Sequence, residues 1–224
     1  MKKKVAVLLS GCGVFDGAEI YESVLTLLRL DERDAEYRCI APDALQMHVV
    51  DHASGEEVED SRESGSASRS ILQEAARLAR GDILELSQAS PDDYDAVILP
   101  GGFGVAKNFS TFASEGAECE VRNDVRQFVQ AFHKAGKPIG LMCIAPAITA
   151  KLVAPGILCT VGSDPGVEGA LIAMGGLHKT CGVDEIIVDN THKVVSTPAY
   201  MLASRITEAR DGIFKLVDKV LDLS

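Results

Sequence analysis

Short apolar runs alternate with longer helical patterns along the chain, and this alternation restricts the fold more than any other feature. The apolar runs lack a regular polar alternation, as expected of strands buried on both faces of a parallel sheet. Strands that alternate with helices predict a mostly parallel sheet covered by helices on both faces. The predicted strands are 5–10, 37–41, 95–99, 139–142 and 157–161, with a hairpin over 185–188 and 193–196; the predicted helices are 20–30, 121–135, 145–152, 167–174 and 201–221.

The length and composition fit one domain over residues 1–224. Of the 224 residues, 46% are hydrophobic and 25% are charged, which is ordinary for a protein with its own core. No shift of composition marks a domain boundary. Two segments near 47–70 stand outside the alternation. We expect a hairpin at 49–58 and a polar Ser/Gly loop at 61–70.

The charge balance disfavours a nucleic-acid partner. The chain has 22 Lys and Arg against 33 Asp and Glu, a net charge of −11, whereas phosphate-backbone binding needs clustered cations. The apolar run after Lys2–Lys4 ends at Leu9, which is too short for a signal sequence or a membrane span. We therefore expect a soluble cytoplasmic protein with reduced cysteines and no membrane partner.

Cys143 is the strongest candidate for a reactive residue. None of the six cysteines forms a C-x-x-C pair, which disfavours the usual zinc and thioredoxin motifs. Cys143 lies between the predicted strand 139–142 and a helix with Pro146 in its first turn. Such a turn exposes a side chain above the sheet, and the positive end of the helix favours a thiolate. The N–H of Ile144 would point to the place where an oxyanion forms.

Other candidate site residues meet Cys143 at the same edge of the sheet, where the carboxyl ends of parallel strands gather. Gly101 and Gly102 follow the strand 95–99 and could supply a second oxyanion N–H. Glu19, in the first turn of the first helix, is a candidate proton carrier. It fits equally well as the last residue of a capping box that begins at Asp16.

Three further residue patterns carry weaker signals. Lys107 could bind a substrate oxygen, and His178 follows two glycines in an irregular stretch. The glycines at 11, 13 and 17, with Asp43 after the second predicted strand, leave open a dinucleotide-binding loop. The carboxylate of Glu19 disfavours that alternative, because it would lie near the pyrophosphate.

Four motifs together resemble one known family. They are SGCGVFDG at 10–17 with Glu19, PGGFG at 100–104 continuing to Lys107 and Asn108, GLMCIAPA at 140–147, and STPAYM at 196–201. They are similar to those of the ElbB-type glyoxalases, also called enhancing lycopene biosynthesis or isoprenoid biosynthesis proteins. That family is a branch of the class I glutamine amidotransferase-like superfamily, and the resemblance covers nearly the whole chain.

The resemblance implies an α/β fold of the flavodoxin-like type, a three-layer sandwich with a mostly parallel sheet. It implies a homodimer that converts glyoxal, a small aldehyde, to glycolate without a metal or other cofactor. Cys143 would form a hemithioacetal and Glu19 would move the proton between the two carbons. Backbone amides near Gly102 and Ile144 would hold the oxyanion.

The sequence departs from related hydrolases in one respect that leaves two other functions open. Ile144, not a histidine, follows Cys143, and the segment 160–164 contains no histidine. A complete Cys–His–acid triad therefore lacks support. One alternative is a non-enzymatic redox or stress sensor that is oxidised at Cys143. The other is an amidotransferase-like subunit that acts with a synthase partner.

Overall fold

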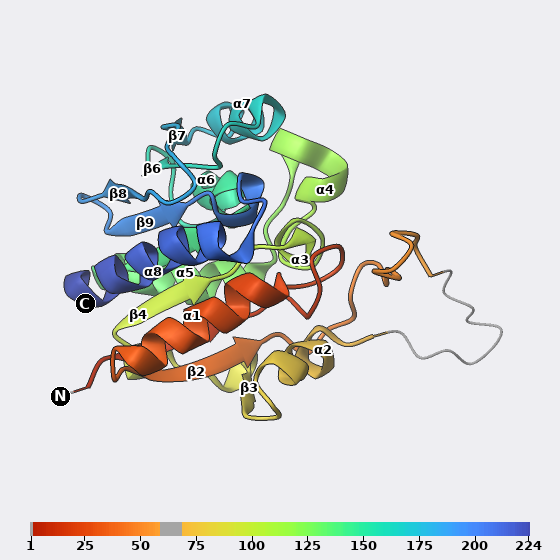
Figure 1. Ribbon diagram of the computed structural model, residues 1–224, viewed down its shortest axis with the longest axis horizontal. Helices are drawn as coiled ribbons and strands as arrows, with labels where there is room; N and C mark the ends of the chain where they lie inside the picture. Colours follow the sequence, from red (N-terminus) through yellow and green to blue (C-terminus); the bar gives the residue numbers. More distant parts are fainter. Residues whose placement is uncertain (1, 59–68) are drawn as a thin grey trace.

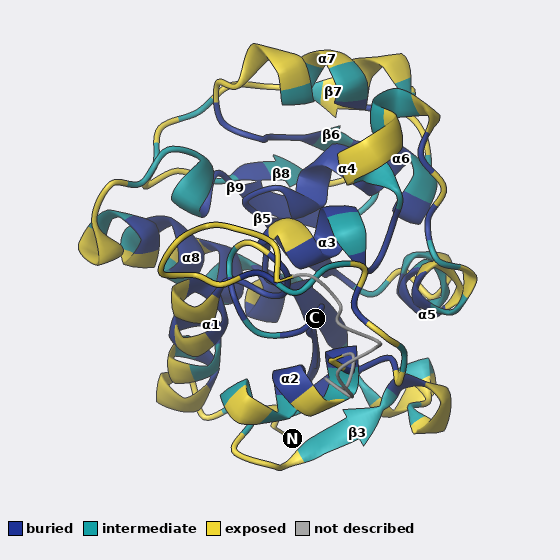
Figure 2. Ribbon diagram, turned by 90° about the vertical axis from the view of Figure 1, so that its right-hand side faces the viewer, coloured by how far each residue is buried: buried dark blue, intermediate teal, exposed yellow. Residues whose placement is uncertain are grey.

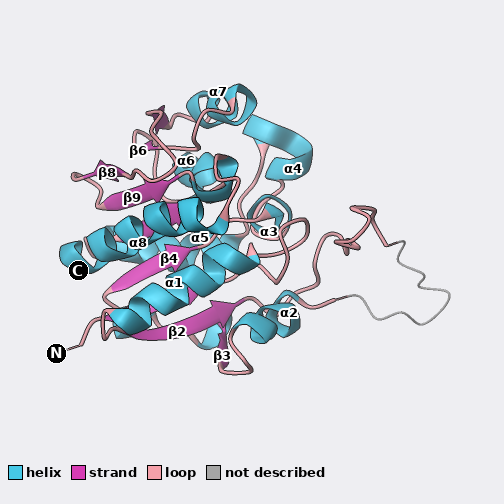
Figure 3. Ribbon diagram, in the orientation of Figure 1, coloured by secondary structure: helices cyan, strands magenta, loops and turns pink. Residues whose placement is uncertain are grey.

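A seven-stranded sheet forms the centre of the structure, a computed structural model that describes residues 2–58 and 69–224. The strand order is β3-β2-β1-β4-β5-β9-β8, and every neighbouring pair is parallel except β8 and β9. Figure 3 shows these strands as one layer among the helices. The strands are β1 (Lys4–Leu8), β2 (Glu36–Ala41), β3 (Ile83–Glu85), β4 (Ala96–Leu99), β5 (Ile139–Met142), β8 (Ile187–Asp189) and β9 (Val194–Thr197).

Helices cover both faces of this sheet. The longest helices are α1 (Ile20–Glu32), α5 (Asn123–Lys134) and α8 (Ile206–Leu223). Helices α1 and α8 pack side by side on one face and α5 lies on the other, as Figures 1 and 2 show from two directions. The shorter elements are α2 (Ile71–Leu78), α3 (Phe103–Lys107), α4 (Phe112–Glu115), α6 (Thr149–Leu152), α7 (Pro165–Ala173), and the 3-10 helices η1 (Leu86–Gln88), η2 (Pro91–Asp93), η3 (Gly116–Glu118), η4 (Ala145–Ile148) and η5 (Ala199–Met201). The predicted three-layer α/β sandwich is confirmed.

The central strands are buried because helices cover both of their faces. Every residue of β4, β5 and β9 is buried, and Figure 2 shows the middle of the sheet in the buried colour. Gly140 lets α8 approach β5 closely: a methyl group there would lie 2.9 Å from Leu216 and 3.1 Å from Val220. This packing fixes the carboxyl end of β5, where Cys143 follows.

Two segments differ from the sequence-based expectation. The apolar segment 157–161 contributes β6 (Leu158–Cys159), which does not join the main sheet and pairs instead with β7 (Leu177–His178). Helix α2 and strand β3 were not expected, because α2 is short and β3 has only three residues. The predicted hairpin over 185–188 and 193–196 is present as the antiparallel pair β8–β9, shifted by one or two residues.

The region near 47–70 is described only in part. Val50 and Glu57 form an isolated antiparallel bridge within the segment 49–58. Most of the predicted polar loop at 61–70 lies outside the described residues, and only Arg69 and Ser70 are included. Within the described part of the chain, no helix combines the length and the apolar character needed to cross a membrane.

Candidate active site around Cys143

Cys143 occupies a strained turn directly after β5. Its φ angle is +59°, in the left-handed region that costs a non-glycine residue energy and often marks a functional position. The turn is held from behind, because the Cys143 N–H donates to the carbonyl oxygen of Thr197 at 3.1 Å. The residue is only 7% exposed. Cys143 therefore lies on the predicted turn, but in a buried position.

Gly101 and Gly102 bring a second loop against Cys143. A methyl group at Gly101 would lie 2.4 Å from the Cys143 Cβ, so only glycine allows this approach. Gly102 has a φ angle of +92°, and a methyl group there would meet the Gly17 carbonyl oxygen at 2.3 Å. The backbone N–H groups of Gly102 and Ile144 both point at the Cys143 sulfur and lower the pKa of its thiol. The two expected oxyanion amides thus lie at the sulfur.

The carboxyl group beside the thiol belongs to Glu22 of α1. Glu22 has no exposed surface. Its Oε2 accepts the Gly101 N–H at 2.8 Å, and its Oε1 accepts the Tyr200 N–H at 3.2 Å. Its carboxyl lies beside Cys143, since a methyl group at Gly101 would meet both the Cys143 Cβ at 2.4 Å and the Glu22 Oε2 at 2.9 Å. Two backbone segments therefore fix the orientation of this carboxyl next to the sulfur.

Glu19 has a different position and a different contact. It is the N-cap residue of α1, and its Oε2 accepts the backbone N–H of Glu22 at 2.6 Å. Its own N–H donates to the Gly101 carbonyl oxygen at 2.9 Å. Glu19 thus satisfies an unpaired donor at the start of the helix. The cap is Glu19 itself, and Asp16 accepts from Val50 instead.

Burial sets the protonation of the Cys143–Glu22 pair. Burial first, and the charge of Glu19 second, raise the pKa of the Glu22 carboxyl to about 7. Burial and the charge of Glu22 raise the pKa of the Cys143 thiol well above its ordinary 9.0. The helix-terminus effect expected to favour a thiolate does not dominate, because η4 and α6 are only four residues each. Near neutral pH the thiol therefore keeps its proton, and the Glu22 carboxyl is partly protonated.

Tyr200 holds the oxygen of the Glu22 carboxyl that Gly101 does not bind. Its N–H bonds Glu22, and its ring lies 6.1 Å from that of Tyr21. Ala199, just before it, has a φ angle of +44° and is completely buried. The strained segment after β9 therefore positions the backbone donor that holds Glu22.

The side chains of Lys107 and His178 contact residues other than Cys143. Lys107 ends α3, and its Nζ lies 5.9 Å from the centre of the Phe103 ring. The His178 side chain is 2% exposed, and its Nδ1 lies 3.2 Å from a carboxyl oxygen of Glu168 in α7. The structure thus joins Cys143, Gly101, Gly102 and Ile144, but it gives Lys107 and His178 other neighbours.

The glycine loop at 11–17 is occupied by the protein's own backbone. The Gly104 N–H donates to the Gly17 carbonyl oxygen at 2.9 Å, and the Asn108 amide donates to Ser10 and Asp16 at 2.8 Å each. The loop N–H groups of Gly13 and Gly17 bond within the loop as well. This arrangement supports α3 and the oxyanion loop, and it leaves those groups unavailable to a dinucleotide phosphate.

Glu22 and Tyr200 were not found as site residues from the sequence. Glu22 lies three residues after Glu19, on the same helix face as Ser23, Leu25 and Thr26. A charged residue on a buried helix face needs a partner, so a buried position for Glu22 would have indicated a site residue. This position was hidden because the apolar residues at helical spacing, Ile20, Val24, Leu25, Leu27 and Leu28, do not mark one face of the helix: Leu25 is buried, whereas Ile20, Val24 and Leu28 are exposed.

A model of the DJ-1/PfpI family, which is a class I glutamine amidotransferase-like fold, matches residues 3–176. The chain belongs to this family. It is 45% identical to the rat protein named "ES1 protein homolog, mitochondrial" over 232 aligned residues, which cover 100% of this chain and 85% of the rat protein. Its fold matches an isoprenoid biosynthesis protein with an amidotransferase-like domain from Ehrlichia chaffeensis, with a TM-score of 0.90, 34% identity and 99% of each chain covered.

Glyoxalase III from Candida albicans has the same fold at greater distance. The TM-score is 0.63, the identity is 14%, and the match covers 99% of this chain and 97% of that one. At this identity the similarity concerns the fold.

The comparisons correct the expected location. The rat relative, and the curated relatives from human and zebrafish, are all named as mitochondrial proteins. This contradicts the expectation of a cytoplasmic protein, which rested on the short apolar run after Lys2–Lys4.

Proposed function

We propose that this chain is a glyoxalase of the ElbB type, which converts glyoxal to glycolate with Cys143 as nucleophile and Glu22 as proton carrier. The observation that carries the proposal is the buried pair itself. A thiol and a carboxyl with a pKa of about 7 meet at Gly101, and two backbone N–H groups point at the sulfur. A general base with a pKa near neutrality is suited to proton transfer at physiological pH. Glyoxalase III on the same fold supports the reaction class.

The first step joins the thiol to the aldehyde. Glu22 takes the thiol proton, and the Cys143 sulfur attacks one carbonyl carbon of glyoxal to form a carbon–sulfur bond. The carbonyl oxygen becomes an alkoxide within reach of the Gly102 and Ile144 N–H groups, which stabilise its charge. The protonated Glu22 then returns its proton to this oxygen, and the product is a hemithioacetal.

The second step moves hydrogen between the two carbons without an external oxidant. The Glu22 carboxylate removes the proton from the carbon bonded to sulfur, and the electron pair forms an enediolate. The same proton then adds to the second carbon, and the hydroxyl proton of the first carbon moves to the oxygen of the second. The first carbon is oxidised to a thioester, the second is reduced to an alcohol, and water hydrolyses the thioester to glycolate and free Cys143.

Glu22 takes the role that the family resemblance assigned to Glu19. Its carboxyl lies beside the thiol and raises the pKa of that thiol, whereas the Glu19 carboxylate is occupied by the helix backbone. Glu19 acts on the reaction indirectly, because its charge helps to raise the pKa of Glu22.

The test is glycolate formation from glyoxal, followed by NMR, with Cys143→Ala and Cys181→Ala as a matched pair. Cys181 is a partly exposed thiol whose sulfur contacts Thr160. We expect Cys143→Ala to abolish glycolate formation and Cys181→Ala to retain it. Mass spectrometry of the quenched wild-type enzyme should find an adduct with the mass of glyoxal on Cys143.

Two results would overturn the proposal. One is full glycolate formation by Cys143→Ala. The other is a folded wild-type protein that forms no glycolate while peroxide selectively oxidises Cys143, which would favour the redox sensor. The depth of Cys143 and its raised thiol pKa argue against that sensor, because peroxide-sensing cysteines are exposed and have a low pKa.

A further inference from the structure

A cavity of about 650 Å³ lies on the side of the molecule formed by α3, α5 and α6. Figure 2 shows α5 and α6 on this side, and the two helices are in contact. Neither Cys143 nor Glu22 lines the cavity. It is lined by Lys107, Asn108, Ser110, Thr111, Cys119, Glu120, Val121, Arg122, Asn123, Arg126 and Lys151.

The cavity concentrates positive charge in an acidic protein. Four of its eleven lining residues are cationic and one, Glu120, is acidic, whereas the whole chain has a net charge of −11. The Arg122 side chain is partly neutralised by Asp124 at 2.8 Å. The other three cations make no ion pair with any carboxylate of residues 2–58 and 69–224; they are Lys107, Arg126 and Lys151.

Two of these three cations are held in place by neutral groups. The Lys151 Nζ donates to the Cys119 carbonyl oxygen at 2.7 Å, and an Arg126 Nη donates to the Asn123 side-chain oxygen at 2.9 Å. Each keeps further donors free, since an ammonium has three and a guanidinium five. The cations therefore retain their full charge at the cavity.

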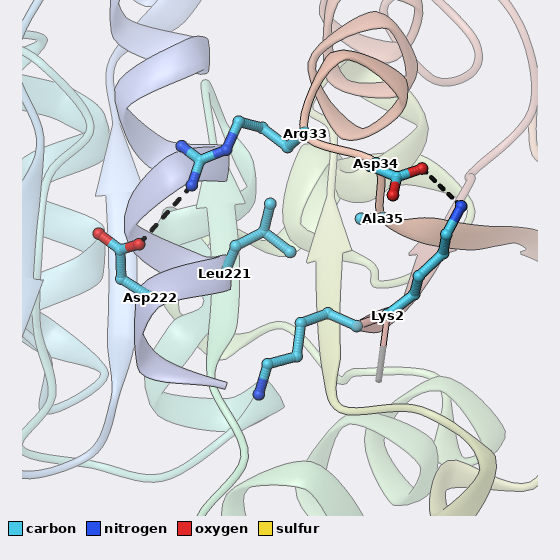
Figure 4. Close-up of a pocket in the computed structure, with 7 residues that line it drawn as sticks. Lys2, Arg33, Asp34, Ala35, Leu221 and Asp222 are labelled. Carbon is cyan, nitrogen blue, oxygen red and sulfur yellow. Dashed lines mark hydrogen bonds and ion pairs between the residues drawn. The ribbon is translucent and has the colours of Figure 1, made fainter.

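A second charged cavity differs from the first in the pairing of its charges. It lies between the start of β1 and the end of α8, and two of its three cations are paired: Lys2 with Asp34, and Arg33 with Asp222 (Figure 4). The third, Lys3, donates to the Ser224 backbone oxygen. Arg33 also bonds Asp218 at 2.7 Å. Paired charges of this kind leave little attraction for an external anion, unlike those between α3, α5 and α6.

We propose that the cavity between α3, α5 and α6 binds a small phosphate-bearing molecule. Cations without carboxylate partners suit phosphate oxygens. The lining contains no aromatic side chain on which a nucleobase could stack. A polynucleotide is disfavoured because the positive charge is confined to one cavity of an acidic chain.

The test is calorimetric titration of the full chain with inorganic pyrophosphate, using Arg126→Gln and Lys134→Gln as a matched pair. Both variants remove one positive charge from α5, but Lys134, in its last turn, does not line the cavity. We expect Arg126→Gln to raise the Kd about tenfold or more, as for the loss of one charged hydrogen bond. Lys134→Gln should leave it within about twofold, because an exposed charge outside the cavity is screened by salt.

Two outcomes would overturn the proposal. One is no binding of pyrophosphate by the wild-type chain at millimolar concentration. The other is equal weakening in Arg126→Gln and Lys134→Gln, which would show nonspecific attraction. Cys143→Ala should bind pyrophosphate as the wild type does, so failure of the glyoxalase proposal and failure of this one are separable. Thermal unfolding of each variant confirms that it is folded.

Discussion

The two faces of α1 differ in a way that reverses the usual distribution of polarity. The face toward the sheet carries Glu22, Ser23 and Thr26, all without exposed surface. The face toward solvent carries Ile20, Val24 and Leu28, each more than 40% exposed. A helix that only had to cover a core would place these residues the other way round. The inner face also carries the buried Leu25 and Leu30, so it combines packing against the core with a carboxyl held beside Cys143.

The largest effect is expected on the inner face. Glu22→Gln should reduce glycolate formation about a hundredfold or more, because an amide cannot carry the proton between the two carbons. Glu19→Gln is the control, since it removes a carboxylate from the same helix but keeps an oxygen that can cap the backbone. Equal activity in Glu22→Gln and the wild type would show that the reaction does not need the Glu22 carboxyl.

The second prediction concerns stability against pH. The pKa of Glu22 is about 7 in the folded state against an ordinary 4.5, so the folded state binds more protons between these values. Stability is therefore lost as pH rises through this window, by about 3 kcal/mol at 1.36 kcal/mol per pKa unit. Urea unfolding at pH 5 and pH 8 measures the loss. Glu22→Gln should flatten the dependence, and an unchanged slope in that variant would contradict the assignment.

The sequence predicted the layers of the fold better than the details of the site. Buried strands such as 95–99 and 139–142 are continuous apolar runs, and their order with the helices defines a parallel sheet. The elbow at Cys143 and the glycine loop at Gly101 followed from the same pattern, because strand ends meet at one edge.

The choice between Glu19 and Glu22 could not be made in that way. It depends on the rotation of α1 about its axis, which its apolar residues do not fix, because they lie on both the buried and the exposed side. The thiol protonation likewise depends on burial, which only the packed structure provides.

The third prediction concerns the cap between the two faces. Glu19→Ala should cost about 1 kcal/mol of folding stability, because the Glu22 N–H loses its acceptor. It should also shift the pH dependence of activity to lower pH, since the charge of Glu19 raises the pKa of Glu22. Urea unfolding and a pH–activity series measure the two effects. Complete loss of activity at every pH would assign Glu19 a direct role instead.

The smallest effect is expected on the outer face. Val24 is 47% exposed, so Val24→Thr should change the free energy of unfolding by less than about 0.5 kcal/mol. Thr26→Val on the inner face is the matched comparison and should disturb the protein more, because Thr26 is completely buried against Met142. A larger loss in Val24→Thr than in Thr26→Val would mean that the outer face is the packed one.

The central claim is that the Glu22 carboxylate lies beside the Cys143 thiol and raises its pKa, and the rate of Cys143 alkylation by iodoacetamide against pH tests it most directly. The Glu22 carboxylate raises the pKa of the thiol. Glu22→Gln should therefore shift the alkylation profile to lower pH and make Cys143 react faster at pH 8, although this variant forms little glycolate. An alkylation profile identical to that of the wild type, or one shifted to higher pH, would contradict the account.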